Sequence, residues 1–400
     1  MTEKGRFGMK FLFASDSFKG TLTSEQTIAL LKKAAGEIFP GCETGGVPVA
    51  DGGEGTTEAV VKARQGRLVP VRVQGPLGEG TEAFYGVLSE QEAILEMASA
   101  SGLPLLPEER RDPRITTSYG TGELVHAVLK AGFRDISIAI GGSATNDGGM
   151  GFARALGVRF LDRAGHELMG RGEDLAKVSH IDVTGLDPLA REARFIVMCD
   201  VTNPLCGPDG ATWTFGKQKG GTPEMLEQLE AGMQNYRDVI RREFGIDPDR
   251  IKGGGAAGGL GTALMVYLGA EMKSGIETVL DLIHFDEKLV GVDAVITGEG
   301  RTDWQSCFGK VVQGVGDRAK RHGIPVYVLS GSLGQGYEQI YEHGVNSVMT
   351  TVDGPMPLSE ALERAEELYY RGAVRLFRFL SGPQAQLKLW REPHPESSRV

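Results

Sequence analysis

The sequence lacks most of the motifs that mark common enzyme classes. It has four cysteines in 400 residues and no Cys-x-x-Cys pair, which argues against a disulfide framework or a cysteine zinc site. Its seven histidines are scattered, without the His-Glu-x-x-His spacing of zinc hydrolases, and no Gly-x-Ser-x-Gly elbow marks a serine hydrolase. The Gly-x-x-x-x-Gly-Lys spacing of a Walker A loop is also missing. Any phosphate chemistry must therefore use a different loop.

Long apolar runs and an excess of positive charge are also lacking. No run approaches the length of a membrane span, and the first residues lack the apolar core of a signal peptide, so we expect no membrane partner and a cytoplasmic location. Lys and Arg number 43 and Asp and Glu 53, a net charge of −10. This balance argues against a nucleic-acid partner and means that a phosphorylated ligand needs local cations. The oligomeric state stays open, with a homo-oligomer compatible with the sequence.

Glycine, by contrast, is abundant, with 58 residues that gather in loops after short apolar runs. Apolar runs alternate with amphipathic stretches, a pattern typical of α/β proteins. We expect a discontinuous domain with a doubly wound parallel sheet, residues 9–75 and 285–380, and a second α/β domain, residues 76–284, inserted into it. Residues 381–400 have three prolines and scattered charge, which predicts a flexible tail.

The segment Phe11–Gly20 is the most informative part of the chain. Its apolar run ends in Asp16, Ser17 and Lys19, and a capping box beginning at Thr23 then starts a helix. In open α/β sheets, ligands bind at the carboxyl ends of the strands, where helix N-termini attract anions. A lysine and an acid at this edge indicate a bound phosphate, with a metal as a further expectation.

Two other strand ends carry acids in glycine-rich or turn-forming segments. Asp51 and Glu54 lie among glycines before a predicted helix, where they could hold Mg²⁺, meet a substrate hydroxyl or cap the helix. Asp200 and Asn203 follow another apolar run. Asp200 could deprotonate a hydroxyl or hold a metal, and an Asx-type turn before Pro204 is the alternative.

Small residues and lysines fill three further loops. Gly141–Gly149 carries Ser143, Thr145 and Asn146 after an apolar strand, and its backbone N–H groups suit either an anion-binding nest or a plain turn. Lys219 lies between glycines, where it could meet ATP phosphates or simply be solvated. A third loop precedes an apolar helix whose N-terminus could face phosphates. Its glycines include Gly255, Gly258 and Gly259.

The strand Ala294–Thr297 leads into Glu299, Arg301 and Asp303 at alternate positions. Arginine stabilises the charge of a transferring phosphoryl group, and acids can hold Mg²⁺ or orient a nucleophile. Lys310 follows at a predicted helix start and could add a cation. A surface cluster of salt bridges is the alternative, although so apolar a strand is expected to end at the functional edge of a sheet.

Taken in this order, these segments resemble the type 1 family of bacterial glycerate kinases, over about Met9 to Phe379. The resemblance implies two α/β domains, one Rossmann- or flavodoxin-like, with the site in the cleft between them. It also implies ATP-dependent phosphorylation of D-glycerate, giving 2-phosphoglycerate, with Mg²⁺. Lys217 and Val312 depart from usual prolines of the family, and Gly253-Gly254 is atypical. The matching stretches are Asp16–Gly20, Ala50–Thr56, Gly120–Leu124, Gly141–Gly149, Cys199–Gly207, Gly255–Gly261 and Thr297–Asp303.

For such a kinase we expect in-line transfer of the γ-phosphoryl group of ATP to a glycerate hydroxyl. Lys19 and Arg301 would neutralise phosphate charge, and Lys219 with the Gly255–Gly261 helix start would hold the nucleotide. Positioning should dominate catalysis if the transition state is loose.

The acids complete the expected site. Asp51 and Asp303 would hold Mg²⁺ or orient the acceptor hydroxyl, and Asp200 would be the base. Rival interpretations are a kinase for another small hydroxy acid and a catalytically silent ligand-binding or regulatory protein. The residues expected to bind substrate or nucleotide are Asp16, Ser17, Asp51, Glu54, Ser143, Thr145, Asn146, Asn203, Lys219, Gly255, Gly258, Gly259, Glu299 and Lys310.

Overall fold

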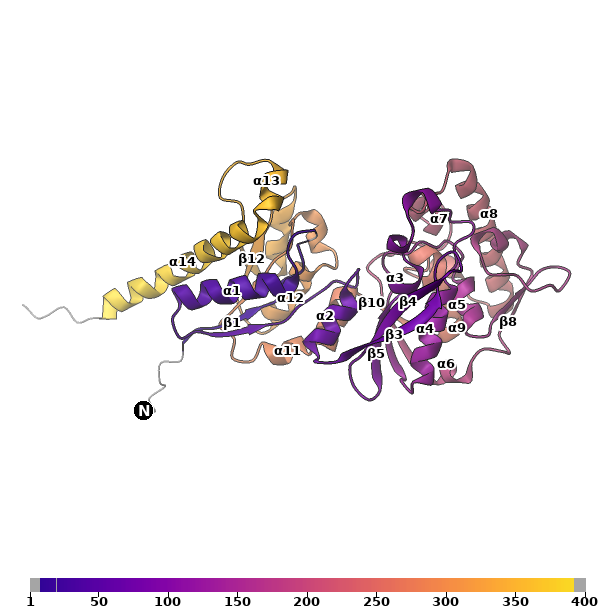
Figure 1. Cartoon of the computed structure of the whole chain (residues 1–400), viewed down its shortest axis with the longest axis horizontal. Helices are drawn as coiled ribbons and strands as arrows, with labels where there is room; N and C mark the ends of the chain where they lie inside the picture. Colours follow the sequence, from indigo (N-terminus) through magenta and orange to yellow (C-terminus); the bar gives the residue numbers. More distant parts are fainter. Residues whose placement is uncertain (1–7, 19, 392–400) are drawn as a thin grey trace, which may run out of the picture. The chain divides into compact units, whose positions relative to one another are not determined.

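The protein folds into two compact units, each with its own sheet (Figure 1). The computed structural model describes residues 8–18 and 20–391, with side chains up to residue 382. Unit 1 is built from the residues up to Val49 and from His284 onward, and unit 2 is Ala50–Ile283. Unit 2 is therefore inserted between two segments of unit 1. Within the described residues, no helix combines the length and apolar composition needed to cross a membrane.

Unit 1 contains a five-stranded parallel sheet in the order β13-β12-β11-β1-β2. Its central strands are almost fully buried, as expected when helices cover both faces. The chain runs from β1 to β2 on one side and from β11 to β12 on the other, so the strand order reverses between β1 and β11. Ligands bind at such a switch point in doubly wound folds. The strands are β1 (Lys10–Phe13), β2 (Glu43–Gly46), β11 (Ala294–Thr297), β12 (Val326–Ser330) and β13 (Val345–Thr350).

Helices cover both faces of this sheet. The helix α1 begins at the expected capping box, in which Thr23 Oγ1 accepts from the N–H of Gln26 and the Gln26 side chain accepts from the N–H of Thr23. The helices α1 and α14 pack together on one face, and α12 covers the other (Figure 1). The helices are α1 (Ser24–Ile38), α11 (Phe285–Lys288), α12 (Val311–Arg321), α13 (Leu358–Glu363) and α14 (Ala365–Arg391), with the 3₁₀ turns η7 (Trp304–Cys307) and η8 (Tyr337–His343).

Residues 381–391, expected as part of a flexible tail, are helical, and their flexibility stays a prediction. The helix α14 continues through them to Arg391, across Gly382 and Pro383, although both residues disfavour a helix interior. Two of the three prolines of the segment come after Arg391. Residues 392–400 lie outside the described residues.

Unit 2 contains a six-stranded mixed sheet in the order β10-β9-β6-β5-β4-β3. The strands β5, β6, β9 and β10 are parallel, and β3 and β4 form an antiparallel edge. The expected domain boundary near residue 75 is wrong, because β3 pairs with β4 from Arg67 to Gln74 and therefore belongs to unit 2. The strands are β3 (Arg67–Gln74), β4 (Gly80–Val87), β5 (Glu92–Glu96), β6 (Asp135–Ala139), β9 (Arg194–Met198) and β10 (Glu271–Lys273), with the hairpin β7 (Arg159–Leu161) and β8 (His180–Asp182) beside the sheet.

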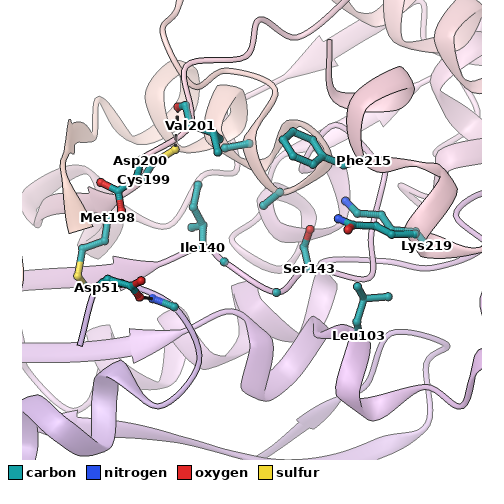
Figure 2. A pocket seen from close by; sticks show the side chains of 17 residues that line it. Asp51, Leu103, Ile140, Ser143, Met198, Cys199, Asp200, Val201, Phe215 and Lys219 are labelled. Atoms are coloured by element: carbon teal, nitrogen blue, oxygen red, sulfur yellow. Dashed lines mark hydrogen bonds between the residues drawn. The ribbon is translucent and has the colours of Figure 1, made fainter. Parts of the chain in front are cut away.

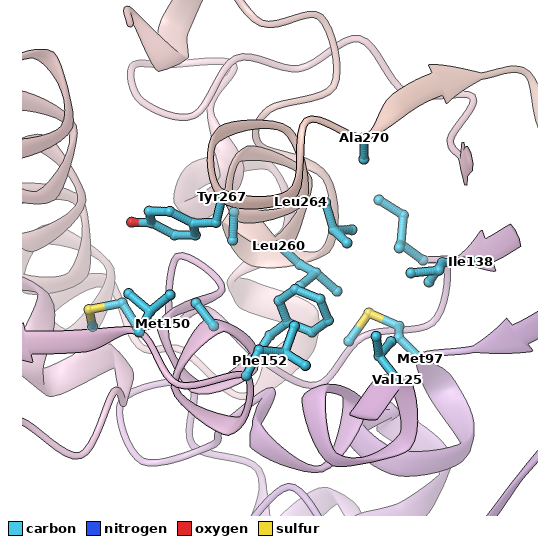
Figure 3. Packing of buried hydrophobic residues seen from close by; sticks show 14 of the residues in the cluster. Met97, Val125, Ile138, Met150, Phe152, Leu260, Leu264, Tyr267 and Ala270 are labelled. Carbon is cyan, nitrogen blue, oxygen red and sulfur yellow. The ribbon is translucent and has the colours of Figure 1, made fainter. Parts of the chain in front are cut away.

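The core of unit 2 lies between its sheet and the helices α4, α5, α8 and α9. Ile138 of the sheet packs with Val125, Phe152 and Leu264 from these helices (Figure 3). The helices α2 and α10 cover the opposite face. The helices are α2 (Thr56–Ala63), α3 (Ala98–Ser101), α4 (Tyr119–Lys130), α5 (Met150–Ala155), α6 (Pro188–Glu192), α7 (Ala211–Phe215), α8 (Pro223–Phe244), α9 (Leu260–Leu268) and α10 (Gly275–Leu282). The 3₁₀ turns are η1 (Leu103–Leu105), η2 (Glu108–Arg110), η3 (Gly172–Lys177), η4 (Lys217–Lys219), η5 (Pro248–Arg250) and η6 (Ala256–Gly259).

Two helical glycines of unit 1 should respond oppositely to alanine. In α12, a Cβ at Gly316 would lie 2.3 Å from the carbonyl oxygen of His343, so Gly316→Ala should lower the free energy of unfolding by about 1–3 kcal/mol. In α1, Gly36 is exposed with open space around it, so Gly36→Ala should raise that free energy by about 0.5–1 kcal/mol. Urea unfolding of the full chain measures both. Equal effects would contradict the described packing of α12.

Candidate active site

A pocket of about 310 Å³ lies at the carboxyl ends of β6 and β9 in unit 2 (Figure 2). The loops that follow these two strands form two of its walls, and the segment before α2 forms another. Such an edge is where ligands bind in open α/β sheets. Its larger apolar lining residues are Leu103, Ile140, Met198, Val201 and Phe215, and its polar ones include Asp51, Ser143, Asp200, Gln218 and Lys219.

Two expected acids meet on one side of this pocket. Asp51 and Asp200 both line it, although they are far apart in the sequence (Figure 2). The first residue of α10, Gly275, donates its N–H to Asp200 Oδ1 at 2.9 Å. A Cβ on Gly275 would lie 2.0 Å from the carbonyl oxygen of Asp51, so only glycine lets α10 begin this close to both acids.

The environment of Asp200 makes it a proton acceptor near neutral pH. The residue retains exposed surface, yet its carboxylate lies among the pocket atoms, and this desolvation is the main cause that raises its pKa to about 6. The negative charge of Asp51 raises the pKa further, and the hydrogen bond from Gly275 opposes the shift.

A pH profile should therefore report Asp200. If it accepts a proton, the reaction needs its ionised form, which is present above pH 6 and is lost as the pH falls through about 6. We expect kcat/KM to fall tenfold per pH unit below that value. The profile is measured between pH 4.5 and 8 on the full chain, and Asp200→Asn should lack this acidic limb. If the fall in kcat/KM at acidic pH persisted in the variant, a group other than Asp200 would be responsible for it.

Lys219 forms the opposite, cationic side of the pocket. Its residue is 1 % exposed, and Nζ donates to the carbonyl oxygen of Thr145 at 2.6 Å. Burial lowers the pKa of Lys219 to about 7. Ser143 lies on the same side of the pocket (Figure 2). The pocket is thus polarised, with carboxylates on one side and an amine and a hydroxyl on the other.

The glycines expected before α9 have a packing role. Gly255, Gly258 and Gly259 lie outside the pocket lining. A Cβ at Gly258 would lie 2.0 Å from the carbonyl oxygen of Thr145, and one at Gly255 would lie 2.1 Å from that of Pro204. The two alanines between Gly255 and Gly258 line the pocket instead. These glycines therefore let backbone segments approach each other, and the expected direct contact with phosphate stays a prediction.

Four other expected residues of unit 2 also lie outside the pocket lining, and one of them, Thr145, is fully buried. Asn203 donates from Nδ2 to the carbonyl oxygen of Asp209 at 2.7 Å, so its described contact is within the loop. Glu54 is exposed. Asn146 is fully buried and donates to Thr212 Oγ1 at 3.1 Å, so its described contact is structural.

In unit 1 the expected charged loops lie together at the switch point. Asp16 donates its N–H to the carbonyl oxygen of Gly298 at 2.9 Å, which joins the loops that follow β1 and β11. Ser17 donates its N–H to Asp16 Oδ1 at 2.6 Å. Lys19, the expected cation of the first loop, lies outside the described residues.

The acids and cations after β11 have different environments. Glu299 is 7 % exposed, burial raises its pKa, and its Oε1 has no hydrogen-bond partner in the described part of the chain. Arg301 is largely exposed and pairs through Nε with Asp303 Oδ2 at 3.2 Å. Asp303 also caps η7 by accepting the N–H of Gln305. Lys310 immediately precedes α12, and its charge favours the ionised form of Glu299.

The described residues contain no cluster of three or more His, Cys, Asp or Glu side chains that could hold a metal alone. Mg²⁺ often binds through one or two carboxylates, with phosphate and water oxygens completing its shell. Asp51 in unit 2 and the unpartnered Glu299 Oε1 beside Asp303 in unit 1 offer such incomplete sets. The donors therefore suit an ion that arrives with a nucleotide.

Comparison with known proteins identifies the family. Residues 11–381 match the model of the glycerate kinase family. The chain belongs to this family. It is 44 % identical over 366 residues to the glycerate kinase of Bacillus subtilis (strain 168), covering 91 % of this chain and 96 % of that protein. It is also 44 % identical over 358 residues to the glycerate 2-kinase of Escherichia coli (strain K12), covering 89 % and 94 %.

A solved structure matches both sheets of the fold. A crystal structure from Salmonella typhimurium LT2, named "putative glycerate kinase 2", is 43 % identical, with a TM-score of 0.85 and coverage of 94 % of this chain and 100 % of that chain. The resemblance found in the sequence and the α/β fold class are thereby confirmed. The chain is a kinase of this family, and so a phosphotransferase.

Sequence reasoning missed the apolar walls of the pocket. Leu103, Met198 and Phe215 come from different elements, and apolar residues at these places look like ordinary core residues in the sequence. It also missed Gly275, whose N–H bonds to Asp200. The local sequence signal for this contact was Gly275 itself, a glycine that follows Ser274 at the start of a helix.

Proposed function

We propose that this protein transfers the γ-phosphoryl group of ATP to D-glycerate and forms 2-phosphoglycerate. Membership of the glycerate kinase family supports the reaction class, and the Escherichia coli relative is named as a glycerate 2-kinase. The observation that carries the proposal is the polarised pocket, which has Asp200 and Asp51 on one side and Lys219 on the other. The hydroxyl of a hydroxy acid can donate to a carboxylate, and a phosphate is bound by a cation such as Lys219.

In this proposal the acceptor hydroxyl lies at Asp200 and an ATP phosphate at Lys219. The hydroxyl oxygen attacks the γ-phosphorus in line, the bond to the β–γ bridging oxygen breaks, and ADP leaves. The hydroxyl proton goes to the Asp200 carboxylate, whose pKa of about 6 leaves it ionised at neutral pH. Because such transition states are loose, alignment contributes more than proton removal.

The remaining charges have proposed roles in each unit. Mg²⁺, when bound, neutralises charge on the β- and γ-phosphates, and Asp51 and Asp303 are the proposed ligands in their respective units. Arg301 would stabilise the phosphoryl group during its transfer, because its guanidinium is exposed and held by Asp303. Glu299 Oε1, buried without a partner, would accept a hydrogen bond from a ligand or from its bound water.

A coupled ADP-release assay tests the proposed function. D-Glycerate should support turnover with a kcat/KM at least about tenfold above L-glycerate and related small hydroxy acids, because a site built for one arrangement of hydroxyls leaves polar groups unpaired with another. ³¹P NMR of the product should show 2-phosphoglycerate. Preference for another hydroxy acid would contradict the substrate, the 3-phosphate would contradict the position, and no release with any acceptor would contradict the activity.

A further inference from the structure

A completely buried carboxylate stands behind the pocket of unit 2. Asp147, in the loop that follows β6, is 0 % exposed and accepts four hydrogen bonds. Ser118 donates its N–H at 2.7 Å and its hydroxyl at 2.8 Å, Gly149 donates its N–H at 3.0 Å, and Gly151 donates its N–H at 3.3 Å. Such a set holds the side chain in one orientation.

The directions of these hydrogen bonds favour the ionised carboxylate. The N–H of Phe152 donates to Ser118 Oγ at 2.9 Å, so the Ser118 hydroxyl is left to donate its own proton to Asp147. Every contact of the Asp147 carboxyl within the described part of the chain is thus a donor. Burial raises the pKa of Asp147, but three of its four hydrogen bonds come from backbone N–H groups, which can only donate, and these bonds favour the carboxylate.

Lys219 is attached to the same loop. Its Nζ donates to the carbonyl oxygen of Thr145, two residues before Asp147, and the residue also lines the pocket. An ammonium group has three donors, and this bond uses one of them. Burial would neutralise an isolated amine at such a place, and the charge of Asp147 opposes that neutralisation. The two groups are therefore linked by a rigid loop and by their charges.

We propose that Asp147 is a positioning residue that acts through Lys219, because its buried carboxylate favours the ammonium form of the lysine, which is the form that binds an anionic ligand. This inference rests on the proposed function, which places an ATP phosphate at Lys219. The other titratable groups of the pocket are Asp51, Cys199 and Asp200. Among the charges of the described residues, that of Asp147 favours the ammonium form of Lys219.

Calorimetric binding of Mg·ADP between pH 6 and 9 tests the inference. The wild-type affinity should fall as the pH rises past the point where ligand-free Lys219 loses its proton, near 7. Asp147→Asn should move this fall to lower pH by about one unit, which makes binding about tenfold weaker at pH 8 but brings it to within about twofold of the wild type at pH 6. Lys219→Met should bind weakly, and its remaining pH dependence measures the titration of the ligand itself.

Two further variants separate this role from a structural one. The double variant Asp147→Asn with Lys219→Met should bind as Lys219→Met does, because Asp147 acts through the lysine. Asp174→Asn is the matched control, since Asp174 is also a buried carboxylate of unit 2 and bonds the N–H of Arg171 and Nζ of Lys177. It should leave the wild-type pH profile unchanged.

The outcomes are distinguishable. An unchanged midpoint in Asp147→Asn, or a loss of affinity that pH 6 does not restore, would overturn the inference. If that variant does not fold, Lys219→Arg, whose guanidinium stays charged, should bind Mg·ADP without the fall in affinity between pH 7 and 9, and a fall that persists would overturn the inference. If Lys219→Met bound Mg·ADP with wild-type affinity, the proposal that Lys219 binds a phosphate would be wrong. Glycerate-dependent ADP release by the wild type tests the proposed function separately.

Discussion

Replacing Asp200 by asparagine should lower kcat by about 10²-fold or more, with little change in the KM for either substrate. The amide cannot accept a proton, so the acceptor hydroxyl loses both its base and a negatively charged partner. Asparagine keeps an oxygen that can accept the N–H of Gly275, so α10 should still begin at the same residue. Steady-state kinetics at pH 7.5 and thermal unfolding of the same preparation measure the two effects.

A control for this result lies in the same segment. Asp209 is an exposed acid outside the pocket lining, so Asp209→Asn changes the same charge without touching the pocket. It should leave kcat unchanged. If Asp200→Asn kept kcat within about threefold of the wild type, proton transfer to Asp200 would be excluded as a contribution to the rate.

Arg301→Ala should lower kcat by about 10³-fold, because a guanidinium that stabilises the transferring phosphoryl group is worth that much or more in related reactions. Arg301 is largely exposed, and its described contact is with Asp303, so the thermal unfolding temperature should hardly change. Steady-state kinetics with ATP as the varied substrate measures the loss. Arg301→Lys should recover part of the rate, because the charge returns without the planar fork.

Arg364→Ala provides the matched control in unit 1. Arg364 is another solvent-accessible arginine with ion pairs, to Glu360 and Glu367, and it follows α13. Its loss should have little effect on stability, because exposed ion pairs contribute little, and should leave kcat unchanged. A rise in the KM for ATP with an unchanged kcat in Arg301→Ala would show that Arg301 binds the ground state and the transition state equally.

The strand ends that carry the expected acids were predictable from the sequence. The boundaries of β9 and β11 agree with the apolar runs, because these central strands are buried and their side chains must be apolar along the whole length. Once such strands are parallel, their following residues gather at one edge of the sheet. Asp200, just after β9, therefore lies at the same edge as the loop that follows β6, whereas Asp51 reaches the pocket from the segment before α2, which the strand pattern does not place.

Other parts depended on tertiary contacts that the sequence does not display. The strand β2, with the sequence Glu-Thr-Gly-Gly, has no strand-like composition and forms because it pairs with β1 at the edge of its sheet. The domain boundary was misplaced because β3 carries an ordinary strand pattern, and only its pairing with β4 assigns it to unit 2. The sequence likewise does not predict that Gly258 allows close packing whereas its neighbour Ala257 lines the pocket, because both depend on tertiary contacts.

A crystal structure with Mg·AMP-PNP and D-glycerate bound is the most direct test of the account. We expect a glycerate hydroxyl to lie within hydrogen-bond distance of the Asp200 carboxylate, about 2.6–3.2 Å, in the pocket at the carboxyl ends of β6 and β9. We also expect a phosphate of the nucleotide to contact Nζ of Lys219. Glycerate and phosphate bound elsewhere, with neither Asp200 nor Lys219 in contact with a ligand, would contradict it.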